Sequence, residues 1–227
     1  YQTIRDYLYR YAEAAVLQTE SIRRYFLKKV KETYVIPNML EVSALPDVVP
    51  WEERENTIVA VGRLDGNKNH DLLIRAFAMV KDKKDYTVLI YGDGDRKEYL
   101  SSLITELHLD GRVFLKGYSF DVVNEIKKSR IFVLSSKCEG YPNALIEAMS
   151  IGLSCISTDF EGGAARDIIK DSENGLLLKT FGEEEMCRAI ERLISDVNLA
   201  EKLAQNAVKI RTLNNSDAII GQWTDII

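Results

Sequence analysis

The 227-residue chain is long enough for one large domain, or for one domain with part of another. Its net charge of -5 gives no general attraction to nucleic acid, whose phosphates require a dominant basic surface. With 46% hydrophobic residues the composition is globular, and no apolar run reaches the roughly 20 residues that cross a bilayer.

The three cysteines do not indicate a metal site or a disulfide framework. Cys138, Cys155 and Cys187 are widely spaced and odd in number. We expect reduced thiols in a cytoplasmic protein. Cys138 is a poor candidate nucleophile, because only two histidines are present to activate it.

The first 35 residues are interpreted as the tail of a preceding domain. They predict a helix, the short strand AAVLQ and a second helix, and Pro37 ends any helix in the linker segment YVIPN. This segment is too short to bury a core of its own. The basic stretch at 23–31 predicts a solvated helix face, with peripheral contact to an anionic membrane surface as the alternative.

From residue 57 onward, short apolar runs alternate with amphipathic ones. Strands are expected at 57–61, 86–91, 112–117, 130–136, 153–158 and 175–179. Helices are expected at 70–80, 96–107, 120–129, 142–152, 164–170, 183–196, 199–210 and 216–227. Strands that are apolar on both faces and alternate with helices form parallel sheets with right-handed crossovers. We therefore predict an α/β, Rossmann-like parallel sheet with helices on both faces and a ligand at the carboxyl ends of its strands.

Two glutamates lie eight positions apart in the stretch SSKCEGYPNALIEAMSIG. Glu139 precedes a Gly-Tyr-Pro turn, and Glu147 lies within the helix that follows. A carboxylate in such an apolar segment is costly unless it is paired, and the hydroxyls of a polyhydroxylated ligand would pair it. The alternative, equally consistent with the spacing, places Glu147 on the solvent side of the helix.

The start of this helix predicts an anion site. Pro142 is typical of a first helical turn. The backbone N–H groups of Asn143, Ala144 and Leu145 are expected to be free and to point, with the helix dipole, at a ligand. Such a site suits a diphosphate.

A second polar loop follows the first strand of the predicted sheet. The strand ends at Gly62, and Arg63 and Lys68 then supply two cations that can neutralise phosphates. Two surface cations without a ligand are the alternative. His70 is interpreted as a residue that starts a helix rather than as a ligand or a base.

Two glycine motifs look functional but are better explained as turns. Gly92-Asp93-Gly94 follows a strand, yet Lys97 occupies the third glycine position of a dinucleotide fingerprint. Its two aspartates also imitate a metal motif, and a tight turn explains both patterns. Gly162-Gly163 precedes a helix, where it either approaches a ligand or makes a turn.

Taken in order, several segments resemble a known family. They are VGRLDGNKNHDLLIRAF, LIYGDGD, VFLKGY, IFVLSSKCEGYPNALIEAMSIGLSCISTD and NGLLL. They are similar to the nucleotide-sugar-binding half of retaining glycosyltransferases of family 4, which have the GT-B fold. The resemblance covers about residues 35–227, and its most specific element is the pair of glutamates around Gly-Tyr-Pro-Asn.

The resemblance implies a role for each matching residue. Arg63 and Lys68 would bind the donor diphosphate, and Glu139 would face the donor sugar near the reacting carbon. Glu147 would hold the ribose hydroxyls. The other donor-binding positions that it implies are Gly62, Gly117, Tyr118, Gly140, Tyr141, Pro142, Asn143, Ala144 and Leu145. The family needs no metal or other cofactor, and retention through a covalent intermediate and through same-face attack both stay open.

The resemblance also divides the chain. Residues 1–35 correspond to a remnant of the N-terminal acceptor domain and a linker, 36–213 to the donor domain, and 214–227 to a crossover helix. Because the acceptor-binding domain is nearly absent, we expect this chain to bind a UDP- or GDP-sugar but to transfer it poorly alone. The full-length protein is expected to build capsular or other surface polysaccharide on a saccharide or lipid-linked acceptor, in the cytoplasm or at the inner face of the membrane.

Three other interpretations compete with this one. The fold and motifs are shared in part by sugar-nucleotide epimerases and by phosphorylases of GT-B architecture. The continuous motif from Glu139 to Glu147 argues against both, and no signature of a pyridoxal-phosphate lysine is present. The third interpretation is a noncatalytic binding or interaction module that has kept the fold.

Overall fold

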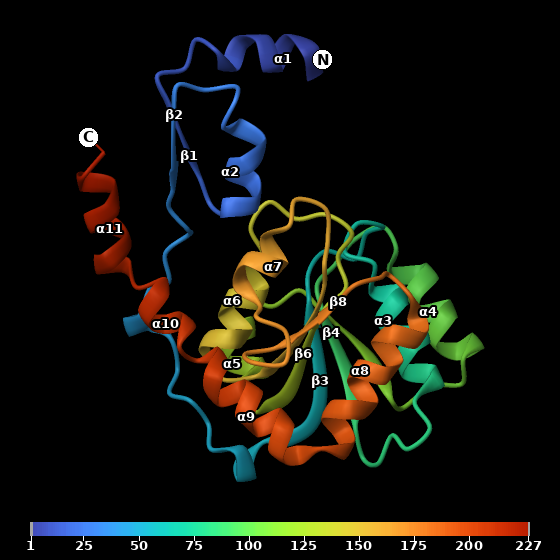
Figure 1. Ribbon diagram of the computed structural model, residues 1–227. Helices are drawn as coiled ribbons and strands as arrows, with labels where there is room; N and C mark the ends of the chain where they lie inside the picture. The colour runs from blue at the N-terminus through green and yellow to red at the C-terminus, as the bar shows by residue number, and fades with distance from the viewer. Residues whose placement is uncertain (1, 227) are drawn as a thin grey trace.

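The computed structural model describes residues 2–226, which form a six-stranded parallel sheet with helices on both faces (Figure 1). The strands are β3 (Glu55–Val61), β4 (Thr87–Tyr91), β5 (Val113–Gly117), β6 (Ser129–Leu134), β7 (Ser154–Thr158) and β8 (Leu176–Leu178). Their order is β5-β4-β3-β6-β7-β8, and every neighbouring pair is parallel. The predicted α/β architecture is therefore confirmed.

Two buried apolar layers hold the helices to the sheet. One face carries α3 (His70–Met79), α4 (Lys97–Glu106) and α8 (Glu183–Ser195), and the other carries α5 (Val122–Ile126), α6 (Asn143–Ser150) and α7 (Ala164–Ile168). Phe77 of α3 and Leu145 of α6 are fully buried in the respective layers. Helix α9 (Val197–Ala207) contributes to both layers at the β7 side of the sheet.

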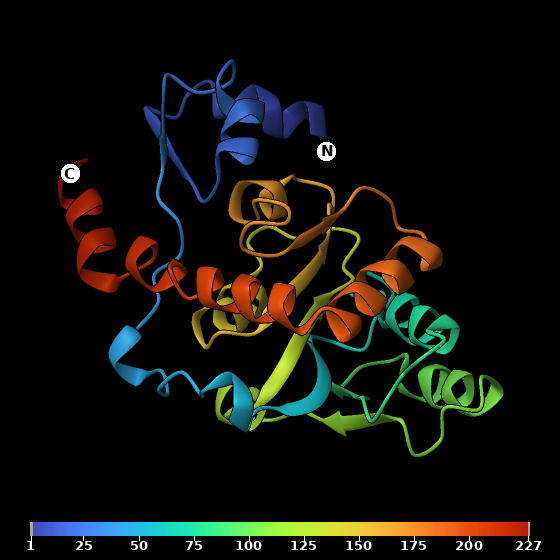
Figure 2. The ribbon, with the colours of Figure 1, turned by 60° about the horizontal axis from the view of Figure 1, so that its bottom comes forward.

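Residues 2–35 form a separate small element beside the sheet (Figures 1 and 2). It consists of α1 (Gln2–Tyr9), β1 (Ala14–Leu17), α2 (Glu20–Phe26) and β2 (Glu32–Val35). The predicted strand is confirmed as β1. The interpretation of YVIPN as a linker is wrong for its first two residues, because they pair in parallel with β1, a long-range contact that local pattern does not reveal.

Three of the five cations in the basic stretch at 23–31 pair with neighbouring acids. Lys29 Nζ lies 2.7 Å from Asp6, Lys31 Nζ lies 2.8 Å from Glu13, and Arg23 pairs with Glu20. This pairing reduces the positive charge that the stretch can offer to anionic lipid. None of the helices between residues 2 and 226 is long and apolar enough to span a membrane.

The chain passes between the small element and the sheet domain twice. The first passage leads through residues 36–40 to the 3-10 turns η1 (Val42–Ala44) and η2 (Trp51–Glu53). The second runs from α10 (Ile210–Leu213) to α11 (Ser216–Thr224), a helix that the sequence predicts; its expected last residue, 227, lies outside the described residues. The two passages meet where the Leu40 N–H donates to the Asn214 carbonyl at 2.7 Å. The domain boundaries near residues 35 and 213 stay predictions.

The buried guanidinium group of Arg54 holds the C-terminal end of α6. Arg54 is 5% exposed and donates to the carbonyls of Val49, Lys127, Ser129 and Ile151 at 2.8–3.2 Å. Burial lowers the pKa of Arg54 to about 10. Since Ile151 caps α6 and Ser129 begins β6, this one side chain joins the entry to β3, the start of β6 and the end of α6.

Replacing Arg54 should destabilise the fold strongly. Arg54→Met leaves four carbonyls without this donor, and we expect a loss of about 3 kcal/mol in the free energy of unfolding. Urea unfolding followed by circular dichroism measures this loss. Arg188→Met, on the exposed side of α8, is the control and should change stability by less than about 1 kcal/mol. Equal effects of the two changes would contradict the role of Arg54.

Candidate functional site

The strand order reverses between β3 and β6, which are neighbours in the sheet. The loops that carry Lys68 and Glu139 follow these two strands. Lys68, in the loop after β3, lies with its Nζ 2.5 Å from Oε1 of Glu139, in the loop after β6. The same carboxylate oxygen accepts a hydrogen bond from the Ser136 hydroxyl at 2.6 Å. The sheet thus brings together Lys68 and Glu139, two of the residues to which the resemblance gives a role at the reacting bond, at the edge where a ligand is expected.

The two loops are fastened to each other by further hydrogen bonds. The side chain of Asn67 donates to the Cys138 carbonyl at 2.8 Å, and the Ser135 hydroxyl donates to the Lys68 carbonyl at 2.8 Å. Oδ1 of Asp65 accepts from the backbone N–H groups of Asn67 and Lys68. These contacts hold the loop of Lys68 against the loop of Glu139.

Gly62 and Arg63 lie beside this pair. The methylene carbons of Lys68 pass 3.0–3.2 Å from the place where a Cβ at position 62 would stand, so a glycine lets the lysine lie across the strand end. The side chain of Arg63 is 80% exposed, and its nearest acid is Asp65 at 3.8 Å. Arg63 is therefore free to reach a ligand.

A cavity of about 600 Å³ opens next to Arg63, at the carboxyl ends of β3, β4 and β5. Its lining residues are Val61, Gly62, Arg63, Tyr91, Gly92, Asp93, Tyr118, Ser119, Phe120 and Val122. Tyr118 and Phe120 stand edge to face with ring centroids 5.0 Å apart and are 69% and 96% exposed. Gly117, at φ +77°, turns the chain sharply just before them. A flat apolar ligand group fits against such exposed rings.

The start of α6 differs in part from the predicted anion site. The N–H of Asn143 donates to the Tyr141 carbonyl and that of Leu145 to the Pro142 carbonyl, both at 3.0 Å, so the expectation of free groups is wrong for these two. The reason is that the helix begins with a tight turn that uses its own first donors. Ala144 is the one of the three whose N–H meets no carbonyl in the described part of the chain.

The Gly-Tyr-Pro turn presents backbone more than side chains. Pro142 and Leu145 are buried. The Tyr141 hydroxyl accepts a hydrogen bond from Asn214 at 2.7 Å. Gly140 is exposed, with open space around its Cα. A ligand at this turn would therefore meet the peptide groups of the turn and the side chain of Glu139.

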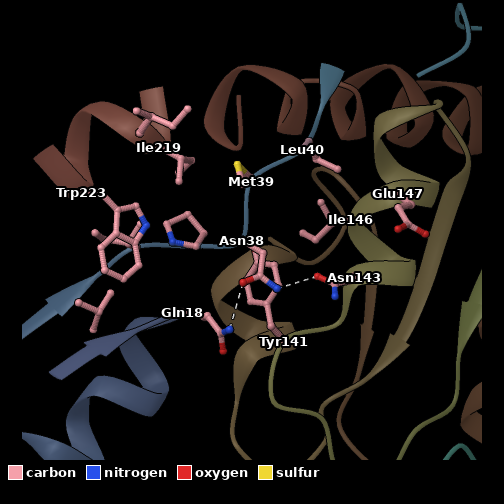
Figure 3. Close-up of a pocket in the computed structure, with 14 residues that line it drawn as sticks. Gln18, Asn38, Met39, Leu40, Tyr141, Asn143, Ile146, Glu147, Ile219 and Trp223 are labelled. Atoms are coloured by element: carbon pink, nitrogen blue, oxygen red, sulfur yellow. Dashed lines mark hydrogen bonds between the residues drawn. The ribbon is translucent and has the colours of Figure 1, made fainter. Parts of the chain in front are cut away.

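Glu147 is half-buried on α6 and lines a second cavity, of about 650 Å³, together with Tyr141 and Asn143 (Figure 3). Burial raises the pKa of its carboxyl group. Its carboxylate has no hydrogen-bond or ion-pair partner among residues 2–226. The solvent-side alternative is thus not what the structure shows, and a partly desolvated acid without a partner suits ligand hydroxyls.

The glycine motifs are explained by close packing. A Cβ on Gly92, at φ +143°, would stand 1.9 Å from the Gly62 carbonyl oxygen, and one on Gly94 would stand 2.5 Å from that of Leu64. Two βα turns therefore pack directly on each other, as the tight-turn interpretation requires. Gly162 and Gly163 also have positive φ, and a Cβ would meet the Glu139 carbonyl oxygen at Gly162 and the Ser21 side chain at Gly163. Across residues 2–226 no group of three or more His, Cys, Asp or Glu side chains is arranged to hold a metal ion.

Residues 42–210 match the family described as "Glycosyl transferases group 1". The chain belongs to this family. A group 1 glycosyltransferase with this sheet has the GT-B type of fold, and the parallel order around β3 and β6 agrees with it.

Curated relatives and solved structures extend this assignment. An N-acetylgalactosamine-N,N'-diacetylbacillosaminyl-diphospho-undecaprenol 4-alpha-N-acetylgalactosaminyltransferase of Campylobacter jejuni is 36% identical over 158 residues, which are 70% of this chain and 42% of the relative. The amylovoran biosynthesis glycosyltransferase AmsD of Erwinia amylovora is 28% identical over 99% of this chain and 64% of the relative. This chain therefore spans about half the length of the curated relatives that it matches.

The crystal structure of Anabaena HepE in complex with UDP and glucose superposes with a TM-score of 0.84. The match covers 96% of this chain and 64% of the other, at 20% identity. At that identity the likeness concerns the fold.

Several contributors to the site carry no local signal. Ser136, which donates to Glu139, and Asn67, which ties the two loops, are ordinary polar residues of loops in the sequence. Phe120 and Tyr91 join the cavity only because β4 and β5 are neighbours. The single local hint is the doubled serine at the end of β6, just before Lys137 and Cys138.

His70 starts α3, as predicted, and is 3% exposed beneath the Gly62 turn. Its Nε2 lies 3.4 Å from the Gly62 carbonyl, while its Nδ1 meets no partner within the described chain. Burial lowers the pKa of this imidazole. The neutral form is thus the one that the fold accommodates.

This burial predicts a pH-dependent stability. Because the folded pKa lies below the unfolded value of about 6.5, the unfolded state binds more protons and the free energy of unfolding falls as pH drops below that value. In urea unfolding, the free energy of unfolding should fall more between pH 7.5 and pH 5.5 in the wild type than in His70→Gln. The control His108→Gln, at an exposed position, should keep the wild-type slope. An identical slope in the His70 variant would contradict the prediction.

Proposed function

We propose that the carboxyl edge of this sheet binds a nucleotide-diphosphate sugar, and that the chain is the donor-binding part of a retaining family 4 glycosyltransferase. The observation that carries the proposal is the contact between Lys68 and Glu139 at the strand-order reversal, beside the cavity lined by Arg63 and Tyr118. A cation, an acid and exposed aromatic rings are the groups that a diphosphate, a sugar and a base require.

We assign each part of the donor to a different group of the site. The base would occupy the cavity against Tyr118 and Phe120, and Glu147 would accept hydrogen bonds from the ribose hydroxyls. Arg63 and Lys68 would bind the diphosphate. Glu139 uses one carboxylate oxygen for Lys68 and Ser136, so its other oxygen is available to a sugar hydroxyl.

The chemistry follows from where charge develops. When the bond between the sugar and the diphosphate breaks, negative charge grows on the leaving phosphate and the sugar gains positive character. Arg63 and Lys68 stabilise the leaving group, which is the electrostatic contribution that a pre-formed site makes to the transition state. Lys68 lies 2.5 Å from Glu139 and so supplies the opposite charge beside the acid that would face the sugar.

The proposed reaction uses no resident metal. Two side-chain cations and the Ala144 N–H supply the positive charge that a metal provides in other phosphate sites. In this proposal the donor is a UDP-sugar or a GDP-sugar. Calorimetry with UDP-, GDP- and ADP-sugars identifies the nucleotide that the chain binds.

The names of the relatives support a setting. One acts on a diphospho-undecaprenol-linked saccharide, and another belongs to amylovoran biosynthesis. We propose a saccharide or lipid-linked acceptor and a cytoplasmic role in surface polysaccharide synthesis, capsular polysaccharide included. Since the chain spans about half the length of these relatives, residues 1–227 are proposed to bind donor but to transfer it weakly by themselves.

Glu147 should be needed for nucleotide affinity. Glu147→Ala removes hydrogen bonds from a charged acceptor, worth roughly 1.5–3 kcal/mol, so the dissociation constant for the preferred nucleotide should rise roughly 10- to 150-fold in calorimetry. Glu98→Ala, at an exposed position on α4, is the matched control and should bind normally. Unchanged affinity in Glu147→Ala would remove the ribose role.

Tyr118 should contribute to binding of the base. Tyr118→Ala should weaken UDP or GDP about tenfold, in line with the strength of a base–aromatic contact, and should leave inorganic diphosphate binding unchanged. The control is Tyr99→Ala, an exposed ring on α4. Equal losses for nucleotide and diphosphate would contradict the assignment. If the wild type binds none of the UDP-, GDP- and ADP-sugars in calorimetry, the noncatalytic module is favoured instead.

A further inference from the structure

The Gly-Tyr-Pro turn is tied to both passages that connect the sheet domain with the N-terminal element. The amide of Asn214, which is 2% exposed, donates to the Tyr141 hydroxyl and to the Asn38 carbonyl, each at 2.7 Å. Asn214 lies in the second passage and Asn38 in the first. The side chain of Tyr141 is therefore held by the place where the two passages cross.

A second connection runs through side-chain amides (Figure 3). Gln18, directly after β1, donates from Nε2 to Oδ1 of Asn38 at 3.0 Å. Asn38 in turn donates from Nδ2 to Oδ1 of Asn143, the first residue of α6, at 2.9 Å. Gln18 donates, Asn143 accepts, and the Asn38 amide between them does both, so a rotation of the Asn38 amide breaks the connection.

Pro142 of this turn is buried and the Cys138 carbonyl accepts a hydrogen bond from Asn67, whereas other parts of the turn are exposed. Cys138, Gly140 and Asn143 are exposed, and Gly140 has open space around its Cα. On one side the turn is fixed by Lys68 and Ser136 through Glu139, and on the other by the two connections from Asn38 and Asn214. A displacement of either passage must therefore move Tyr141 and Asn143 or break these bonds.

We propose that Gln18, Asn38 and Asn214 are positioning residues that couple the seating of the N-terminal element to the geometry of the donor turn. The inference extends the proposed donor site and names residues that do not touch the donor in it. When the N-terminal element is seated, the amide chain and the Tyr141 hydroxyl hold the turn in the conformation that presents Glu139 and the start of α6. When the element moves, the turn loses both restraints.

The first test needs no ligand. Hydrogen exchange of the backbone amides at 138–146 is measured in the wild type, Gln18→Ala, Asn38→Ala and Tyr141→Phe. Gln18→Ala and Tyr141→Phe each remove one hydrogen bond, so exchange in this segment should rise about fivefold. Asn38→Ala removes two hydrogen bonds and should raise exchange at least as much. Tyr99→Phe removes a hydroxyl on α4 and should leave the segment unchanged. Unchanged exchange in Gln18→Ala and Tyr141→Phe would overturn the proposal.

A double-mutant cycle separates coupling from general loosening. The effect of Gln18→Ala on exchange at 138–146 should disappear in an Asn143→Ala background, because the amide chain is already cut there. An effect of the same size in both backgrounds would show that the signal does not pass through Asn38 and would overturn the proposal. Urea unfolding of each variant identifies any change that acts through global stability.

Nucleotide binding then distinguishes this inference from the proposed function. In the wild type, the preferred nucleotide should protect the backbone amides at 138–146, and also those at 36–40, from exchange. Tyr141→Phe should still bind the nucleotide, with affinity lowered three- to tenfold. In this variant the protection at 36–40 should be lost. Absence of any nucleotide binding would refute the donor site, and the ligand-free exchange result would still decide whether the turn is coupled to Gln18.

Discussion

The site depends on one constraint, the adjacency of β3 and β6 where the strand order of the sheet reverses. Loops after neighbouring strands on opposite sides of such a reversal leave the sheet toward opposite faces and open a crevice between them. Lys68 and Glu139 come from these two loops and meet across that crevice. If β3 and β6 were separated by another strand, the cation and the acid would be too far apart to form a pair.

The paired charges also explain why the loops are so well fastened. Glu139 is 12% exposed, and a carboxylate that is withdrawn this far from water requires compensation. Lys68 supplies the opposite charge and Ser136 a hydrogen bond, while Asn67 and Ser135 hold the loops that carry them. These contacts restrain the side chains of the site, and such restraint lowers the entropic cost of binding.

Helix α6 links this polar edge to the rest of the molecule. Its last turn is held by Arg54, its buried side by Leu145 and the apolar layer, and its first turn by Asn38 and Asn214 through Asn143 and Tyr141. The helix is therefore held by packing along its buried side and by side-chain hydrogen bonds at both ends.

The sequence by itself determined the class of fold, because apolar periodicity is local and strand ends are recognisable. It predicted the alternation of strands and helices, the importance of Arg63, Lys68, Glu139 and Glu147, and the turns at the glycine pairs. Tertiary structure alone decided the pairing of β1 with β2 and the joining of Phe120 to a cavity. It also decided that Asn38 and Asn214 meet Tyr141 and Asn143, since contacts between residues 70 to 180 positions apart depend on the packing of whole elements and leave no periodic mark in the chain.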